Sequence, residues 1–201
     1  MPADERWLEA APTGCAAYGE PVEIRRAGPT DWPAIWLIWH EVVAAGDTYA
    51  WDPASDQAAG RAAWMLPPPA EIWVALDGQT VVGTAQLRPN YPALGAHVAN
   101  ASFMVASAAA GRGVGRRLAE HIIERARAAG YRAMQFNAVV STNERAVRLW
   151  KSLGFEIIGT VPEGFRHARL GYVDLYVMHR TLGPAAERGD RRPGEGDQAG
   201  G

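Results

Sequence analysis

The chain has 201 residues, of which 48% are hydrophobic, and a formal net charge of −2. This length and apolar content predict one well-buried α/β domain. The nearly neutral charge gives no general attraction to nucleic acid or to a membrane surface, so we expect neither as a partner. Cys15 is the only cysteine. An internal disulfide and a cysteine-based metal cluster are therefore excluded, and we expect no metal site and a cytoplasmic location.

The two ends of the chain differ from its middle in composition. Residues 1–20 carry acidic residues and prolines in place of a basic start and an apolar core, so no signal peptide is predicted. Residues 183–201 are polar and glycine-rich, a composition typical of disorder. No apolar run is long enough for a membrane-spanning helix. We therefore expect one domain over residues 21–182, between a loose N-terminal segment and a disordered tail.

The predicted elements begin with a short strand and a helix that Thr30 caps, with Pro33 in its first turn. The pair Asp77–Gly78 separates two β-rich segments, which is a strong hairpin signal. Expected helices cover residues 30–45, 55–65, 112–129 and 142–153, and expected strands cover residues 22–26, 71–77, 79–89, 97–105, 132–140, 155–161 and 172–180. This order predicts a mixed sheet with helices on its faces.

The most informative stretch runs from Ser102 to Gly130, where an apolar strand meets a glycine-rich basic turn that opens a helix. Glycines lack the Cβ atoms that keep an anion away from the backbone, and the first turn of a helix offers unpaired N–H groups. The pattern predicts a phosphate-binding loop, against the alternative of an ordinary turn with a solvated basic edge. Its glycines and arginines are Gly111, Gly113, Gly115, Arg112, Arg116 and Arg117.

Two asparagines, Asn100 and Asn137, lie inside predicted strands. Asparagine is depleted in strands, and a buried amide without partners costs about 1–3 kcal/mol. One interpretation is a hydrogen bond to a strand end or to neighbouring backbone. The other is that both amides point into a substrate cleft, where an amide donates to a carboxylate or carbonyl and accepts from an amine.

Two segments resemble the signatures of one family. MVASAAAGRGVGRRL resembles the acetyl-CoA signature of the GCN5-related N-acetyltransferases (GNAT), and TNERAVRLWKSLGFEIIGT resembles their second signature. The resemblance covers residues 22–180. It implies an α/β fold with a mixed, mostly antiparallel central sheet, splayed middle strands and flanking helices, and N-acetyl transfer from acetyl-CoA. Ala110 departs from the Gln or Arg usual in the family, with Arg112 or Arg116 as expected substitutes.

The resemblance also implies which residues hold acetyl-CoA. The backbone of Met104 and Val105 would pair with the pantetheine arm. Asn143 would reach the cofactor from the start of the next helix; its alternative is a helix N-cap, and both roles can hold at once. The pyrophosphate would lie on the loop formed by Gly111, Arg112, Gly113, Val114, Gly115 and Arg116.

The segments NASFMV, FNAVVSTN and LWKSLGF are similar to members of the family that acetylate L-azetidine-2-carboxylate and related proline analogues. This similarity implies that Asn100 and Asn137 handle the imino acid and the acetyl group, with Asn100 as a catalytic residue. A small toxic imino or amino acid is the expected substrate. The alternatives are another toxic amino acid or amine antibiotic, such as a phosphinothricin-like compound, and a non-catalytic acyl-CoA-binding domain.

The reaction needs a neutral amine, a donor for the developing oxyanion and a proton for the leaving thiolate. Trp150 stands where many family members have a tyrosine acid, so we expect it to pack or to line the cofactor site. His97 is a candidate base, although on a regular strand it faces away from Asn100. His121 is expected to face solvent.

Glu41 and Tyr49 lie where the family places its acceptor wall, and either can hold the amine. The alternatives are a solvated helix face for Glu41 and a packed loop aromatic for Tyr49. Arg166 and Arg169 approach a substrate carboxylate or belong to a solvated hairpin tip. The last strands offer an exposed edge, so a homodimer is possible.

Overall fold

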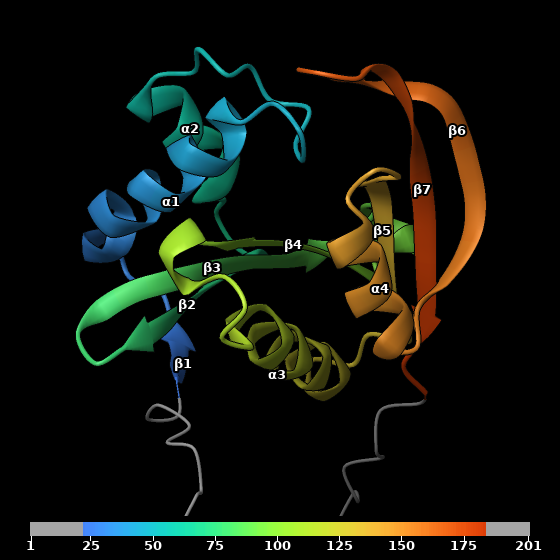
Figure 1. The fold of residues 1–201 in the computed structure, drawn as a ribbon. Coiled ribbons are helices and arrows are strands. Elements are labelled where there is room, and N and C mark those ends of the chain that lie inside the picture. Colours follow the sequence, from blue (N-terminus) through green and yellow to red (C-terminus); the bar gives the residue numbers. More distant parts are fainter. Residues whose placement is uncertain (1–21, 184–201) are drawn as a thin grey trace, which may run out of the picture.

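A seven-stranded sheet forms the centre of the computed structural model, which describes residues 22–183 (Figure 1). The expected loose N-terminal segment and tail lie outside the described residues, apart from Gly183. The strands are β1 (Glu23–Arg26), β2 (Glu71–Asp77), β3 (Thr80–Pro89), β4 (Val98–Val105), β5 (Ala133–Val140), β6 (Glu156–His167) and β7 (Gly171–Thr181). The helices are α1 (Trp32–Ala44), α2 (Gln57–Trp64), α3 (Val114–Ala128) and α4 (Glu144–Ser152), with 3-10 turns η1 (Pro29–Asp31), η2 (Ala93–Gly95) and η3 (Ser107–Ala109).

The strand order is β1-β2-β3-β4-β5-β7-β6, and every neighbouring pair is antiparallel except β4 with β5. The expected mixed, mostly antiparallel sheet is therefore confirmed. The hairpin at Asp77–Gly78 is also confirmed, with Asp77 opposite Thr80 and Gly78 at φ +59°. Glycine adopts this left-handed conformation without a Cβ penalty, which is why the turn forms there.

The centre of the sheet is open between β4 and β5. These two strands pair only at their beginnings, where Val98 is opposite Ala133 and Ala99 is opposite Met134. Beyond these pairs they diverge, and β5 shifts register against β7 between Phe136 and Val139. The later half of β4 therefore has a backbone edge that no strand covers.

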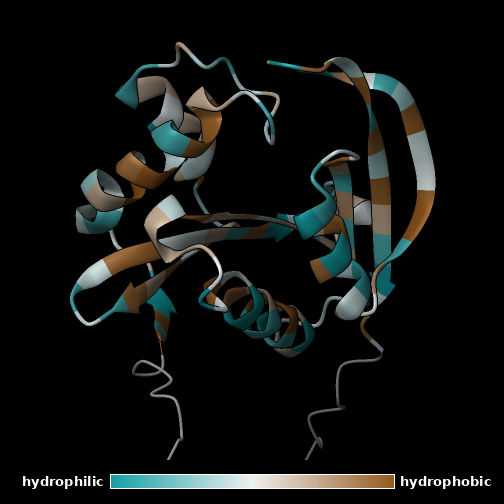
Figure 2. Ribbon diagram, in the orientation of Figure 1, coloured by the Kyte–Doolittle hydropathy of each residue, from teal (hydrophilic) through white to brown (hydrophobic). Residues whose placement is uncertain are grey.

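Helices cover both faces of the sheet. On one face α1 and α2 pack through Ile35, Trp39 and Trp64 against apolar side chains of β2. On the other face α3 packs through Leu118 and Ile122. Figure 2 shows hydrophobic residues along α1 and the central strands. Among residues 22–183, no helix has the length and apolar character needed to cross a membrane.

The start of α1 differs from the prediction. Thr30 does not cap it, because one 3-10 turn precedes the helix and Asp31 accepts a hydrogen bond from the Gly28 N–H at 2.7 Å. Asp31 also binds Arg25 at 2.8 Å. The closed turn from Gly28 to Asp31 therefore takes the place of the predicted cap, and α1 begins at Trp32.

The last two strands are longer than predicted, and they form a hairpin that arches over the sheet toward the loop after α1 (Figure 1). β6 continues past Val161 because the following residues form a bulge, with Glu163 at φ +51°. An edge strand tolerates the proline that falls in this bulge. At the hairpin tip the Ala168 N–H donates to the Gly46 carbonyl at 2.9 Å. The hairpin thus encloses space above the open centre of the sheet.

Candidate active site

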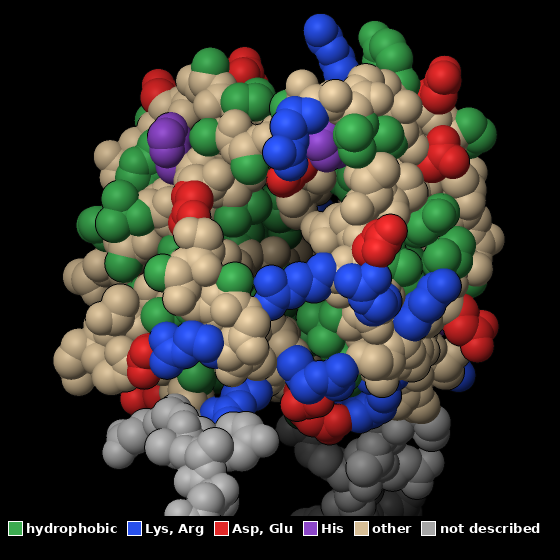
Figure 3. Space-filling model, in the orientation of Figure 1, with side chains coloured by type: hydrophobic (Ala, Val, Ile, Leu, Met, Phe, Trp, Pro, Cys, Tyr) green, Lys and Arg blue, Asp and Glu red, His purple; other side chains and the backbone are tan. Residues whose placement is uncertain are grey.

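Two adjoining cavities lie where β4 and β5 diverge. One, of about 420 Å³, is lined by Val105, the glycine loop and the start of α3, and we call it the glycine-loop cavity. The other, of about 350 Å³, is lined by Asn100, Asn137 and the loop after α1, and we call it the asparagine cavity. They share Thr48, Phe103, Asn143, Ala146 and Trp150. Figure 3 shows a hollow near the centre of this face with Lys and Arg side chains gathered below it.

The glycine-loop cavity has the geometry of an anion site. Gly111 and Gly113 have φ values of +83° and +80°, and a Cβ added to either would meet no protein atom within 4 Å. The space before both glycines is therefore open to a ligand. Val114, Gly115 and Arg116 are the first residues of α3, so their N–H groups have no acceptor inside the helix. Such N–H groups and the helix dipole bind phosphate.

The open edge of β4 offers further backbone groups. The Ala106 N–H donates to Val82 O at 3.0 Å and the Asn90 N–H donates to Val98 O at 2.8 Å, which places even-numbered β4 residues in the β3 ladder. Backbone direction alternates along an antiparallel strand, so the N–H and C=O of Val105 point into the opening. Met104 lines the cavity, but its backbone groups face β3. The expected role of the Met104 backbone is thus corrected.

The basic residues near the loop separate into two groups. Arg116 lines the glycine-loop cavity and donates to Ser152 Oγ at 2.6 Å. Arg145, at the start of α4, also lines it and was missed by the sequence analysis. Arg112 instead pairs with Asp77 at 2.7 Å and does not line the cavity, because the β2–β3 turn lies beside it. This corrects the expectation that Arg112 substitutes for the Gln or Arg side chain that is missing at position 110.

Two asparagines that line the asparagine cavity, Asn100 and Asn137, both bind a third, Asn90, which is not part of its lining. Asn90 Oδ1 accepts from Asn100 Nδ2 at 2.9 Å and from Asn137 Nδ2 at 2.7 Å. Asn100 and Asn90 are buried, whereas Asn137 is exposed at the cavity. Asn90 Nδ2 is buried and has no partner within the described residues. The sequence analysis missed Asn90 because it follows β3, where an asparagine is unremarkable and carries no strand anomaly.

Asn143 lies where the two cavities join. It is the N-cap of α4, and its Oδ1 accepts from the Ala146 N–H at 3.1 Å. The capping interpretation is therefore confirmed, and its contact with the cofactor stays a prediction. Trp150 is buried against Phe103 and Phe136 and lines both cavities. Its indole packs in the divide between the strands, where the family pattern has tyrosine.

The Tyr49 hydroxyl is bound to the open edge of β4. It donates to Phe103 O at 2.9 Å and accepts from the Phe103 N–H at 3.0 Å. Burial raises the pKa of Tyr49 to about 12, so the hydroxyl stays protonated. Its ring lines the asparagine cavity and stacks on Trp51 with 4.8 Å between ring centroids. The hydroxyl is thus engaged by backbone, which corrects the expectation that it holds the amine.

Glu41 and two histidines also lie elsewhere than expected. Glu41 accepts from the Ser107 N–H at 3.5 Å and lines neither cavity, because its turn of α1 faces η3. His97 is exposed, with Nδ1 3.1 Å from Leu94 O, and it lines neither cavity. His121 is half-buried against Trp73, and burial lowers its pKa. The expectation that His121 faces solvent is therefore wrong.

The β6–β7 hairpin closes the far side of the site. Phe165 lines the asparagine cavity, and His167 and Arg169 line a neighbouring space of about 540 Å³ beside Thr48 and Asn143. His167 Nδ1 accepts from the Arg169 N–H at 3.0 Å, which leaves its proton on Nε2. Arg166 is exposed and lines neither of these spaces.

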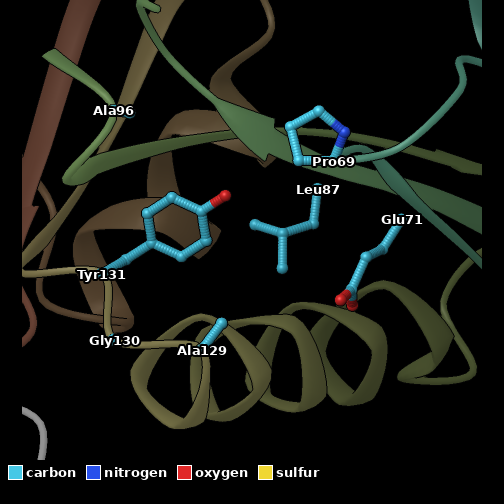
Figure 4. A pocket seen from close by; sticks show the side chains of 7 residues that line it. All are labelled: Pro69, Glu71, Leu87, Ala96, Ala129, Gly130 and Tyr131. Atoms are coloured by element: carbon cyan, nitrogen blue, oxygen red, sulfur yellow. The ribbon is translucent and has the colours of Figure 1, made fainter. Parts of the chain in front are cut away.

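A separate cavity of about 310 Å³ lies at the other end of α3, and its lining includes Glu71 and the Tyr131 hydroxyl, which points into it (Figure 4). Glu71 binds Arg125 at 2.6 Å and Arg26 at 2.9 Å. The hydrogen bond from Arg125 is the main reason that the pKa of Glu71 is lowered. Because these two arginines form ion pairs with Glu71, the one charged residue of the lining, the cavity offers no unpaired charge to a ligand. Residues 22–183 contain no cluster of three or more potential metal ligands.

The residues of the glycine-loop cavity fit acetyl-CoA: open glycines and a helix N-terminus for phosphates, and a free strand edge for an extended arm. A glycine-lined helix start beside a splayed strand pair defines a coenzyme A-dependent acyltransferase. The chain belongs to the acetyltransferase (GNAT) family, whose profile matches residues 35–155. The protein is a GNAT N-acetyltransferase with acetyl-CoA as its co-substrate.

Two curated relatives are named acetyltransferases. The L-methionine sulfoximine/L-methionine sulfone acetyltransferase of Pseudomonas aeruginosa is 34% identical over 168 residues, which cover 80% of this chain and 95% of that protein. The N-acetyltransferase aca1 of Schizosaccharomyces pombe is 33% identical over 113 residues, or 55% of this chain. This match spans 54%, about half, of the yeast protein.

Solved structures share the fold. A GCN5-related N-acetyltransferase from Kribbella flavida is 53% identical, with a TM-score of 0.76, covering 80% of this chain and 97% of that chain. A phosphinothricin acetyltransferase from Sinorhizobium meliloti in complex with acetyl-CoA is 25% identical, with a TM-score of 0.71, covering 87% of this chain and 94% of that chain. The expected GNAT fold is confirmed.

Proposed function

We propose that this enzyme acetylates the amine of a small toxic imino or amino acid, with L-azetidine-2-carboxylate as the first substrate to test. The observation that carries the proposal is the amide cluster of Asn90, Asn100 and Asn137, of which Asn100 and Asn137 line the asparagine cavity. A cavity of about 350 Å³ has room for an acceptor the size of an amino acid. It adjoins the glycine-loop cavity, so the acceptor and the acetyl group can meet.

The cluster leaves usable groups facing the acceptor. Asn90 Oδ1 accepts one N–H from each of the other two amides. The carbonyl oxygen and the second N–H of Asn100 therefore stay available to a ligand. The carbonyl can accept from the amine, and an amide N–H can donate to the acetyl carbonyl oxygen as negative charge develops there. The free N–H of Val105 is a second donor for the same oxygen.

The asparagine cavity contains no carboxylate or histidine among its lining residues, and its tyrosine stays protonated. The acceptor ammonium therefore loses its proton to water. The neutral amine then forms the new C–N bond at the thioester carbon, and the C–S bond breaks. The nitrogen releases one further proton as the amide forms, and coenzyme A leaves as a thiolate that takes up a proton, so the reaction needs no dedicated acid.

A second candidate substrate is L-methionine sulfoximine or a phosphinothricin-like amino acid. The P. aeruginosa relative bears the name of the first activity and matches this chain over 95% of its own length. The S. meliloti structure bears the name of the second. Both candidates are amino acids with a free α-amine, so the same cluster would serve them.

We also propose a homodimer that forms along β6. β6 is the last strand of the sheet and exposes Ile158 and Val161, and Tyr172 is exposed beside it on β7. An uncovered strand edge with apolar side chains is a surface for pairing with a second copy. Light scattering should give twice the mass of the chain, and Val161→Lys should lower the measured mass.

We propose a cytoplasmic location because the single cysteine leaves no internal disulfide to maintain.

Release of coenzyme A in the presence of a panel of imino acids, amino acids and other amines tests the function. L-azetidine-2-carboxylate and L-methionine sulfoximine should raise the rate well above hydrolysis. Asn100→Ala or Asn137→Ala should lower kcat/KM for the acceptor by about 100-fold, the size of a lost oxyanion donor. The affinity for acetyl-CoA should stay within about twofold of the parent, as it should in the exposed amide control Gln79→Ala. Equal losses in turnover and in acetyl-CoA affinity would contradict the proposal.

A further inference from the structure

Arg88 is the one charged side chain in the lining of the asparagine cavity. It lies on β3 directly opposite Asn100 on β4. Directly opposed residues of antiparallel strands project from the same face, with Cβ atoms about 5 Å apart. Arg88 and Asn100 therefore face the same small space.

The guanidinium of Arg88 is oriented but not neutralised. Its Nε donates to Gln86 Oε1 at 3.2 Å, and Gln86 is itself buried and held by the bond from its Nε2 to Trp64 O at 2.8 Å. No acidic side chain forms an ion pair with Arg88 in residues 22–183, although seven other arginines there have such a partner. The two terminal nitrogens of Arg88 also form no hydrogen bond with any of these residues.

We propose that Arg88 binds a carboxylate of the acceptor, so that the substrate is an amine carrying an acid group on the same or an adjacent carbon. This inference rests on the proposed function. An arginine presents two parallel N–H donors that match a carboxylate, and the contact is strong where water is partly excluded. The short span between Arg88 and Asn100 lets one α-amino or α-imino acid place its carboxylate on the first and its amine at the second.

The same charge selects against other amines. A cationic side chain without an acidic partner repels a polyamine or an aminoglycoside, whose several ammonium groups would need carboxylates in the cavity. None lines it. The inference therefore separates the acceptor class by charge: amino acids and imino acids are accepted, and their decarboxylated or amidated analogues are poor substrates.

The test compares matched substrates in matched variants. L-azetidine-2-carboxylate is set against its carboxamide, and L-methionine sulfoximine against its decarboxylated amine. The parent enzyme should prefer each acid by about 10- to 150-fold in kcat/KM, as expected for hydrogen bonds to a charged group. Arg88→Gln should remove this preference by lowering kcat/KM for the acids alone, with the neutral analogues within about threefold of the parent. Arg88→Lys should restore part of the preference.

Two further arginines serve as rival and control. Arg169 lines the neighbouring space, and Arg169→Gln would abolish the preference if that residue bound the carboxylate. Arg166 is exposed and lines neither space, so Arg166→Gln should leave all rates unchanged. The inference is overturned if Arg88→Gln lowers acids and neutral analogues equally, or if the preference persists in Arg88→Gln. If neutral amines react as well as acids, only this inference fails. If no amine releases coenzyme A while acetyl-CoA still binds, the proposed function itself fails.

Discussion

Replacing Tyr49 by phenylalanine removes one oxygen atom and two hydrogen bonds. The hydroxyl donates to Phe103 O and accepts from the Phe103 N–H, at 2.9 and 3.0 Å. Each such bond contributes about 0.5–1.5 kcal/mol, so the free energy of unfolding should fall by about 1–3 kcal/mol. For a domain of this size that loss lowers Tm by roughly 2–12 °C. Because backbone engages the hydroxyl, kcat/KM for the acceptor should fall less than about fivefold.

Urea unfolding and thermal melting of the Tyr49→Phe variant measure the stability, and coenzyme A release below the transition measures the rate. Tyr131→Phe is the matched control, because the Tyr131 hydroxyl points into a cavity and has no hydrogen bond within the described residues (Figure 4). Its stability should change by less than about 0.5 kcal/mol. Unchanged stability of Tyr49→Phe together with a hundredfold loss of kcat/KM would refute the reasoning. It would indicate that the Tyr49 hydroxyl binds the substrate.

Three further predictions concern the loop, the distal ion pair and the pH profile. Gly113→Val should weaken acetyl-CoA binding more than tenfold in calorimetry, because its side chain enters open space at φ +80°, whereas Gly78→Val, at φ +59° in a hairpin turn outside the cavity lining, should leave affinity unchanged. Glu71→Gln should lower the free energy of unfolding at pH 7 by about 1–3 kcal/mol. The folded-state pKa of Glu71 is lowered from 4.5, so its contribution is present above that pH and lost as pH falls through the folded value; acid unfolding of the variant should be correspondingly shallower. Finally, kcat/KM should rise with pH along the titration of the substrate amine alone, and a second inflection between pH 5 and 8 that the substrate lacks would reveal a catalytic base.

Local patterns were enough to predict most of the elements. The Asp77–Gly78 turn, the helical spacing after Gly113 and the alternation in the central strands depend on near neighbours in the chain, so the sequence carries them directly. The errors arose where distant groups compete for the same atoms. Thr30 lost its capping role to a turn closed by Asp31, and β6 continued through a bulge because its partner β7 supplied Asp174 as an acceptor.

The sequence by itself determined the chemistry available at the site: a glycine loop before a helix, and asparagines in strands where an amide needs a partner. Only the tertiary structure decided which partners those groups have. Asn90 is separated from Asn137 by 47 positions, and Tyr49 from Phe103 by 54. Hydrogen bonds of this kind depend on the divergence of β4 from β5 and on the docking of the loop after α1. The same packing pairs Arg112 with Asp77 and leaves Arg88 unpaired in the asparagine cavity, a distinction that charge alone does not make.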